Sequence, residues 1–394
     1  MTAVDRNLVW TGTLNEAALA GRAPPRANFY DTTLRDGEQS VGVMFDPEQK
    51  LEMARLIDGL GVGRIEAGFP RVSEDDRVAI AAILQAGLQA QIWGFARALP
   101  EDVDAVVELG LKYSVVEAPI SDLKLGALGV TREAVLERIR KAVSHAIAQG
   151  LHVAFFGVDS TRADLAFFEL AYKTARDAGA QEFAIVDTIA IATPEAVTFL
   201  IGKARLWLGQ DAVIHFHGHN DFGLGTACAI AALQAGASWV HGTVDGIGER
   251  AGNANLPEIA LALELLYGAE TGIRFDRVRQ ASQRLREIAG YQLEPWKSVV
   301  GDNLFVRETG AVAAQFHTPE AIEPYSSTLL ATPRGIVLGK KSGVASIRIK
   351  CEELGLEVPA ASHARLLEDV KALAIRNRRL LSDDEFRDLT RNAG

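Results

Sequence analysis

Eight β-rich segments, each followed by a helical pattern, restrict the fold of this chain more than any other feature. The stretches between the segments carry apolar residues at spacings of three and four, which is typical of amphipathic helices. Eight such units within about 240 residues favour a closed parallel (β/α)8 TIM barrel over an open doubly wound sheet. The segments are residues 27–33, 63–69, 90–96, 113–119, 152–158, 182–188, 212–218 and 238–244.

The barrel pattern extends over residues 27–270, and other patterns precede and follow it. Residues 1–26 are expected to form an N-terminal extension, with a weak helical pattern and a proline-rich joint. Beyond residue 270, a helical pattern at residues 275–291 is followed by a stretch rich in Gly and Pro at 300–345 and then by further helical patterns. We therefore expect residues 271–394 to form a small C-terminal helical subdomain that covers the active site.

Composition and charge exclude several classes of partner. The net charge is −10 and Lys and Arg do not cluster, so nucleic acid is not an expected partner. The N-terminus lacks the apolar core of a signal peptide, and no run approaches the roughly 18 apolar residues of a membrane span. We expect a cytoplasmic protein with no membrane partner. Cys228 and Cys351 lie far apart in no C-x-x-C pattern, so they indicate neither a disulfide framework nor a thiolate metal site.

Metal-capable side chains collect in the seventh segment, within HFHGHNDFG at residues 215–223. Residues two apart on a strand face the same side, so His217 and His219 can direct two imidazoles to one point. The competing interpretation is that these histidines only satisfy the polar ends of strands. In a barrel, Asp36 after the first segment and Asn253 after the last would join them at the same end. A mixed His, Asp and Asn site suits Mg, Mn, Fe or Zn.

Three long motifs at these strand ends carry a family resemblance: YDTTLRDGEQS, HGHNDFGLGTA and DGIGERAGNANL. They resemble the signatures of the metal-dependent acyltransferases that comprise the 2-isopropylmalate, homocitrate and citramalate synthases, which are related to HMG-CoA lyase. The resemblance covers residues 27–270, and it continues weakly in GIVLGKKSGVASI, which is similar to the LGK-x-SG segment of the synthases. It implies a TIM barrel, one divalent metal ion and acetyl-CoA as a co-substrate.

The resemblance assigns roles to several residues of this sequence. Arg35 would polarise the carbonyl of a 2-oxo acid and later hold its alkoxide, and Thr188 would grip the carboxylate. A cation that chelates the 2-oxo acid makes its keto carbon electrophilic, and a guanidinium beside it stabilises the developing charge, so the chemistry agrees. The implied metal ligands are Asp36, His217 and His219, with Asn253 completing or supporting the set.

Further polar or flexible positions at the strand ends are expected to bind or orient the substrates. Gln39 and Glu66 would orient the reacting groups, although a structural salt bridge is an equal explanation for Glu66. Arg97 follows the third segment and is expected to contact the substrate. Gly252 lies in a glycine-rich loop that suits a phosphate or the pyrophosphate of an acyl-CoA, or that serves only as a turn.

The sequence departs from the synthases at both positions where they handle protons. Val158 stands where they carry a glutamate after the fifth strand, and Val312 where they carry a histidine in the tail. Because valine accepts no proton, a base must come from elsewhere or the reaction must differ. The candidates are Asp159, Glu308 and His317, of which we expect Asp159 and His317 to be catalytic.

The expected reaction is a Claisen-type condensation of an acyl-CoA, most simply acetyl-CoA, with a 2-oxo acid held by the metal, giving a 2-alkylmalate-like product and CoA. Phe95 and Ala154 stand where homocitrate-type enzymes hold the distal carboxylate of 2-oxoglutarate, so that grip is missing. The alternatives are a metal-dependent carbon–carbon lyase or aldolase of the HMG-CoA lyase type, and a catalytically silent relative that binds metal and ligand. Active sites shared between subunits in the family imply a homodimer.

Overall fold

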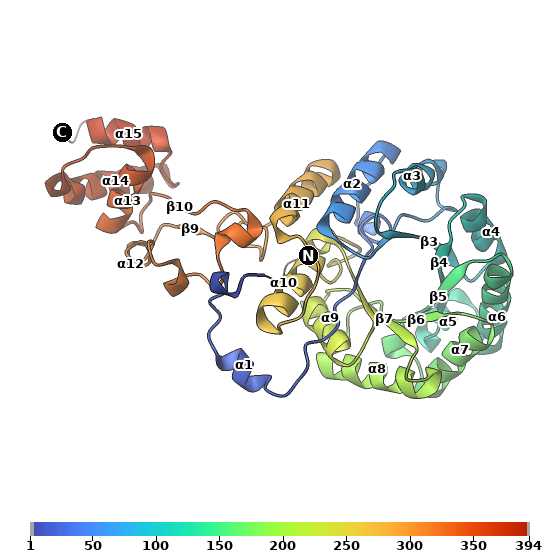
Figure 1. The fold of residues 1–394 in the computed structure, drawn as a ribbon. Coiled ribbons are helices and arrows are strands. Elements are labelled where there is room, and N and C mark those ends of the chain that lie inside the picture. Colours follow the sequence, from blue (N-terminus) through green and yellow to red (C-terminus); the bar gives the residue numbers. More distant parts are fainter. Residues whose placement is uncertain (1–3, 392–394) are drawn as a thin grey trace. The chain divides into compact units, whose positions relative to one another are not determined.

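The computed structural model describes residues 4–391, which form two compact units. One unit contains residues 13–292. The other combines residues 4–12 with residues 293–391. Figure 1 traces both units along the chain. The two units are described separately below.

The first unit is a closed barrel of eight parallel strands in sequence order, in which β8 returns to pair with β1 (Figure 1). This confirms the predicted (β/α)8 TIM barrel. Seven strands lie within the segments predicted for them and β3 extends one residue past its segment, because buried parallel strands produce short apolar runs that are easily recognised. The strands are β1 (Phe29–Asp31), β2 (Arg64–Glu66), β3 (Gln91–Arg97), β4 (Tyr113–Pro119), β5 (His152–Val158), β6 (Glu182–Asp187), β7 (Val213–Gly218) and β8 (Trp239–Gly242).

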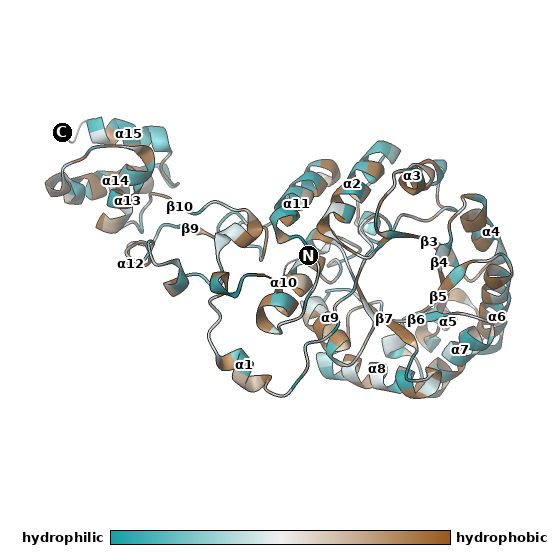
Figure 2. Cartoon of the chain, viewed as in Figure 1, coloured by the Kyte–Doolittle hydropathy of each residue, from teal (hydrophilic) through white to brown (hydrophobic). Residues whose placement is uncertain are grey.

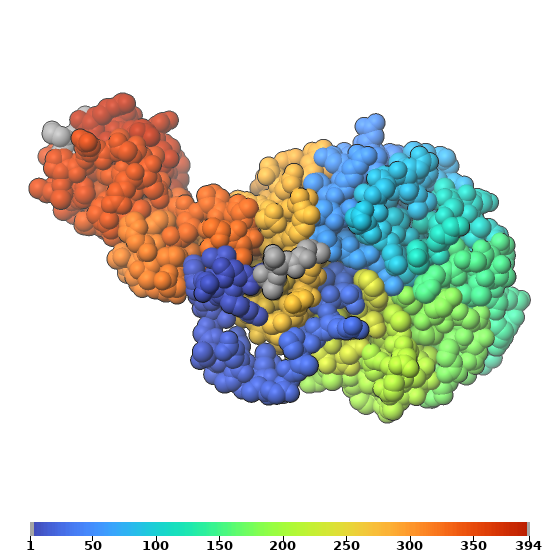
Figure 3. Space-filling model, viewed as in Figure 1, coloured from blue at the N-terminus to red at the C-terminus, as the bar shows by residue number. Residues whose placement is uncertain are grey.

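Helices surround the barrel in sequence order (Figure 1), and the space-filling view shows the colours of the chain passing around this unit from blue through green to yellow (Figure 3). In Figure 2 they carry hydrophilic and hydrophobic residues together, as amphipathic helices do. Their ends follow from local chemistry: α2 begins with a capping box of Asp46 and Gln49 and ends at Gly61 in the left-handed conformation. The helices are α1 (Leu14–Ala18), α2 (Pro47–Leu60), α3 (Glu74–Gln85), α4 (Pro100–Glu108), α5 (Asp122–Leu128), α6 (Arg132–Ala148), α7 (Leu165–Asp177), α8 (Pro194–Leu208), α9 (Gly225–Gln234), α10 (Leu256–Leu266) and α11 (Phe275–Ala289), with 3-10 turns η2 (Gly37–Gln39), η3 (Ser160–Arg162) and η4 (Val244–Gly246).

The barrel unit extends past residue 270, where we expected it to end. Helix α11 belongs to it because Val278 and Leu285 are buried and Arg284 forms a two-pronged ion pair with Glu52 of α2, at 2.8 and 2.9 Å. The sequence of α11 is itself amphipathic, but its partner helix α2 lies more than 200 residues away along the chain. Packing therefore sets the boundary after Gln292.

A buried polar cluster lies inside the barrel near the beginning of the strands, and His215 is part of it. Arg64 donates to both oxygens of Glu182, at 2.5 and 2.9 Å, and its guanidinium stacks on the rings of Trp93 and Trp239. His215 Nε2 lies 2.6 Å from Glu182 Oε2. His215 is thus tied to Glu182, whereas His217 and His219 follow it toward the strand ends.

The second unit contains both chain ends of the described residues. Residues 4–12 belong to it because Val9 forms an antiparallel bridge with Tyr325 and the Trp10 amide donates to Pro324 O at 2.8 Å. The N-terminal extension is therefore not one continuous segment of the barrel unit. Extra C-terminal helices are present as predicted, together with a short parallel strand pair. The elements are η1 (Arg6–Leu8), β9 (Val306–Arg307), α12 (Gly310–Ala313), η5 (Pro319–Ala321), η6 (Ser327–Leu330), β10 (Gly335–Ile336), α13 (Val344–Leu354), η7 (Ala360–Ser362), α14 (His363–Asn377) and α15 (Asp383–Arg391).

Among residues 4–391, none of the helices is both long enough and apolar enough to cross a membrane.

Candidate active site and metal centre

Three buried side chains converge at the end of the barrel where the strands finish. One potential ligand atom each of Asp36, His217 and His219 lies within 4.8 Å of the other two. The Nε2 atoms of His217 and His219 are 3.4 and 3.7 Å from Asp36 Oδ2, so both rings present the same nitrogen to the carboxylate. The structure therefore brings together the three residues that the sequence suggested as metal ligands.

Local backbone geometry places these side chains. The Asp36 amide donates to Thr32 O at 2.8 Å, which turns the chain sharply after β1. His217 lies on β7, and His219, just beyond the strand, forms an isolated bridge with Asn253. Asn253 Nδ2 donates to Ile247 O at 3.1 Å. This bond uses the amide nitrogen, so the amide oxygen of Asn253 remains free to bind a ligand beside His219.

The orphaned polar atoms at this place fit a bound cation. Asp36 Oδ2, Glu66 Oε1 and Asn253 Oδ1 are buried, and none of them has a hydrogen-bond partner among the described residues. Burying an oxygen atom that receives no hydrogen bond costs folding free energy. A cation bound to these oxygen atoms would remove that cost. Two imidazole nitrogens and a carboxylate, with an amide oxygen beside them, form a donor set that suits several divalent metals.

The charges around Asp36 favour its ionised form. Burial would raise the pKa of Asp36, but Arg35, His217 and His219 together hold it well below its usual range. Burial lowers the pKa of His219 to about 4, although Asp36 opposes the shift. A carboxylate and a neutral imidazole are the protonation states that bind metal ions.

Arg35 lies next to the convergent group and is held in a fixed orientation. Its Nε donates to Glu66 Oε2 at 2.9 Å and its Nη1 to Asp36 Oδ1 at 3.1 Å, and the guanidinium lies 4.6 Å from the centre of the Phe95 ring. Burial raises the pKa of Glu66, while Arg35 partly offsets the effect. The sequence allows Glu66 to be either a structural salt bridge or a residue that orients a reacting group. Its position agrees with both, because its salt bridge to Arg35 also orients that guanidinium.

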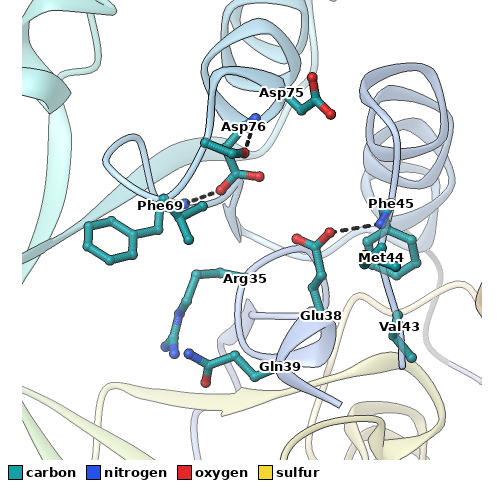
Figure 4. A pocket seen from close by; sticks show the side chains of 11 residues that line it. Arg35, Glu38, Gln39, Val43, Met44, Phe45, Phe69, Asp75 and Asp76 are labelled. Atoms are coloured by element: carbon teal, nitrogen blue, oxygen red, sulfur yellow. Dashed lines mark hydrogen bonds between the residues drawn. The ribbon is translucent and has the colours of Figure 1, made fainter. Parts of the chain in front are cut away.

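A pocket of about 450 Å³ opens beside Arg35. Figure 4 shows that the Gln39 side chain lies next to the Arg35 guanidinium at one side of it. The acidic residues of the lining include Glu38 and Asp76. The buried Lys50 ammonium forms an ion pair with each of these two, at 2.7 Å from Glu38. Apolar side chains complete the lining, namely Val43, Met44, Phe45, Phe69 and Val72.

The glycine-rich loop after β8 borders a second pocket, of about 430 Å³. Gly252 in this loop has φ of +84°, and its amide donates to Glu249 O at 2.9 Å. A Cβ at this position would overlap the carbonyl oxygen of Gly246. The tight turn explains this glycine without a ligand, and a role for Gly252 in substrate binding stays a prediction.

Gly252→Ala is expected to lower the free energy of unfolding by about 3 kcal/mol or more. A left-handed residue other than glycine costs roughly 1–2 kcal/mol, and the overlap with Gly246 adds strain. Gly223→Ala is the matched control, because Gly223 has φ of +73° but nothing within 4 Å of an added Cβ. Urea denaturation of both variants measures the difference. Equal losses of stability would contradict the steric explanation.

Two residues at neighbouring strand ends are linked to each other. The Asp159 amide donates to Thr188 Oγ1 at 2.8 Å, so the hydroxyl proton of Thr188 remains available for a substrate. The Asp159 carboxylate is buried and receives Arg162 Nε at 2.9 Å on both oxygens, and Ser121 donates to it as well. The backbone of Asp159 is in the left-handed conformation, with φ of +65°. These contacts explain Asp159 as a structural residue, and they leave its carboxylate poorly placed to accept a substrate proton.

The remaining predicted residues are held by other partners. Arg97 is half-exposed, and its Nε donates to Asp102 Oδ2 at 2.7 Å. His317 belongs to the second unit, where its side chain is 60% exposed and 3.6 Å from Glu352. Glu308 pairs with Lys341 at 2.9 Å in the same unit. Their catalytic and binding roles stay predictions.

Sequence reasoning missed one residue of this region, Glu117 on β4. Its charge interacts with those of Arg35, Glu66 and Asp36. The signal was present in the sequence, because Glu117 is the only charged residue of the apolar segment YSVVEAP. It was overlooked because a single charged residue does not indicate which way a strand faces.

The family follows from comparison with known proteins. A profile of the HMGL-like family matches residues 26–285, more than half of the chain. The chain belongs to the HMGL-like family. Among similar proteins, homocitrate synthase AksA of Methanopyrus kandleri is 41% identical over 381 residues, covering 96% of this chain and 95% of the relative. The probable 2-isopropylmalate synthase of Ignicoccus hospitalis is 38% identical over 368 residues, covering 93% and 92%.

Another relative is longer than this chain. The putative (R)-citramalate synthase CimA of Methanopyrus kandleri is 38% identical over 373 residues, covering 94% of this chain and 73% of the relative. These three relatives bear the names of the synthases whose motifs the sequence resembles, which confirms the resemblance.

Solved structures of this HMGL-like fold share the barrel. The HMG-CoA lyase of Pseudomonas aeruginosa superimposes with a TM-score of 0.62 at 20% identity, covering 68% of this chain and 95% of the lyase. The lyase of Brucella melitensis gives a TM-score of 0.61 at 19% identity, covering 68% and 100%. At this identity the similarity establishes the fold alone.

Proposed function

We propose that this protein is an acyltransferase that condenses an acyl-CoA, most simply acetyl-CoA, with a 2-oxo acid and releases CoA. The observation that carries the proposal is the buried group of Asp36, His217 and His219 with Arg35 directly beside it. The names of the relatives describe condensations of this class, and two strand ends far apart in the sequence, those of β1 and β7, supply the group.

The convergent residues would hold one divalent metal ion, Mg, Mn, Zn or Fe. Asp36, His217 and His219 would be its ligands, and the amide oxygen of Asn253 would support them. Bound there, such an ion supplies Lewis-acid polarisation of a 2-oxo acid. The neutral state of His219 and the ionised state of Asp36 favour this use.

Arg35 would bind the keto oxygen of the 2-oxo acid and stabilise the negative charge that develops on it. Its bonds to Glu66 and Asp36 use Nε and one hydrogen of Nη1, so donors on Nη1 and Nη2 remain for the substrate. Donors that are already oriented need no rearrangement during the reaction, which is why they stabilise a transition state effectively. Gln39 and the hydroxyl of Thr188 would bind the carboxylate and fix its orientation.

The two pockets offer room for two substrates. The chain segment after Gln39 borders both, since Val43 lines each pocket. We place the 2-oxo acid near Arg35 and the acyl-CoA across this segment, with its pyrophosphate near the loop that contains Gly252. A homodimer in the cytoplasm, with the C-terminal unit covering the active site, stays part of the proposal.

A substrate panel tests the proposed reaction. Purified protein is loaded with Mg²⁺, Mn²⁺, Zn²⁺ or Fe²⁺ and mixed with acetyl-CoA and one of several 2-oxo acids, among them pyruvate, 2-oxoisovalerate and 2-oxoglutarate. We expect release of CoA, trapped by a thiol reagent, that depends on both the metal and the 2-oxo acid. Cleavage of a 3-hydroxyacyl-CoA without condensation would indicate a lyase instead, and inactivity toward every compound would indicate a silent relative.

A further inference from the structure

Glu117 adds a third carboxylate to the group around Arg35. It lies on β4 in register with Arg97 of β3 and Phe156 of β5. Phe156 and Val115, two positions before Glu117, belong to the side-chain cluster inside the barrel. Because residues two apart on a strand face the same side, the Glu117 side chain is directed into the barrel as well. It enters near the end where the reacting groups lie.

In the described part of the chain, no side chain pairs with the Glu117 carboxylate, in contrast to those of Glu66 and Asp159. Among residues 4–391, no hydrogen bond or ion pair holds it, and the residue is partly exposed. Glu66 is fully buried and paired with Arg35, and Asp159 is occupied by Arg162 and Ser121. Glu117 also makes no hydrogen bond or ion pair with the proposed ligands, so it is not needed to hold the metal.

The surroundings of Glu117 suit a group that takes up and returns a proton. Burial raises the pKa of Glu117 to about 7; Arg35 opposes the rise, while Glu66 and Asp36 add to it. A general base works best when its pKa lies near the operating pH.

The position of Glu117 also relates to the missing base on the next strand. Val158 of β5 pairs with Pro119 of β4, so Glu117 lies one inward position below it on the neighbouring strand. Two residues along a strand span roughly 6.6 Å, so the Glu117 and Val158 positions are neighbouring inward positions on adjacent strands.

We propose that Glu117 is the general base that removes a methyl proton from the acyl group of the acyl-CoA. This role rests on the proposed function. The C–H bond breaks, its proton passes to the Glu117 carboxylate, and the electron pair forms an enolate. The enolate carbon bonds to the keto carbon of the 2-oxo acid, whose oxygen becomes an alkoxide beside Arg35. The proton held by Glu117 then passes to this alkoxide, which restores the Glu117 carboxylate. Water then hydrolyses the thioester, giving the acid product and CoA.

Glu117→Gln tests the role because it keeps size and polarity but removes the proton acceptor. With the metal and 2-oxo acid that give the highest turnover, kcat is expected to fall about 10²–10⁴-fold. The KM for the 2-oxo acid is expected to stay within about threefold, because the interaction is made in the transition state. The isotope effect on kcat with acetyl-CoA deuterated in its methyl group should increase, since proton removal becomes the slow step.

Two further variants complete the test. Formate should restore part of the lost rate in Glu117→Ala, because it supplies a carboxylate in the space left by the side chain. Glu108→Gln makes the same chemical change at an exposed residue of α4 that pairs with Arg77 at 3.2 Å, and it should leave kcat unchanged. Metal binding measured by calorimetry should be the same in all variants.

The outcomes separate this proposal from the proposed function. If the unaltered protein condenses acetyl-CoA and Glu117→Gln keeps its kcat within about threefold, Glu117 is not the base. A lower kcat without a larger isotope effect and without rescue by formate would also overturn the role. If the unaltered protein releases no CoA with any 2-oxo acid, the proposed function itself fails.

Discussion

Replacing His217 by alanine is expected to abolish both the binding of a divalent metal ion and turnover, while the barrel still folds. The imidazole faces Asp36 and His219 in a buried group, and no other side chain can take its place on β7. Asp36→Ala is expected to have the same effect, because it removes the charged ligand. Isothermal titration with Mn²⁺ and Zn²⁺ measures the binding, and circular dichroism checks the fold.

His145→Ala is the matched control for this prediction. His145 lies on α6, part-buried and 2.6 Å from Asp104, away from the convergent group. It should bind metal and turn over substrate as the unaltered protein does. Metal binding by His217→Ala or Asp36→Ala that is as tight as in the unaltered protein would show that the site is assigned wrongly.

Arg35→Lys is expected to keep metal binding but to lower kcat on the order of 10²–10³-fold, by analogy with the loss of an oxyanion donor. The guanidinium binds Glu66 and Asp36 at once and stacks on Phe95 while it still offers donors to a substrate. An ammonium group keeps the charge but has no planar fork, so it cannot make these contacts together. Steady-state kinetics with the best 2-oxo acid measures the change.

Arg284→Lys serves as the control, since Arg284 forms a comparable fork with Glu52 on the outer helices. Its kcat should not change. An unaffected kcat in Arg35→Lys would remove Arg35 from the proposed reaction, whereas loss of metal binding in that variant would mean that Arg35 mainly positions Asp36.

The fold and the centre of the site could be predicted because local patterns carry them. A buried parallel strand produces an apolar run and an outer helix a spacing of three and four, so each strand of the barrel could be located. The strand period of two placed His217 and His219 on one side, and the closure of the barrel brought Asp36 and Asn253 to them.

The rest of the site depends on contacts between residues distant in sequence. Asp159 looked like a candidate base beside Val158, but its left-handed backbone and its bonds to Arg162 and Ser121 make it a structural residue. Nothing local in the sequence reveals which partner occupies a carboxylate. Glu117 is the reverse case, because its proposed role depends on its charge neighbours, Arg35 among them, and these come from other strands.

The sequence by itself determined the barrel, its strands and the metal-capable group, because periodicity and motif spacing record which faces are buried and which residues end each strand. Only the tertiary structure decided that α11 belongs to the barrel unit. The same holds for residues 4–12, which join the C-terminal unit through Val9 and Tyr325. It also decided which carboxylates are paired and which remain available. The physical reason is that packing partners and charge neighbours are set by distance in space, which the order of residues along the chain does not record.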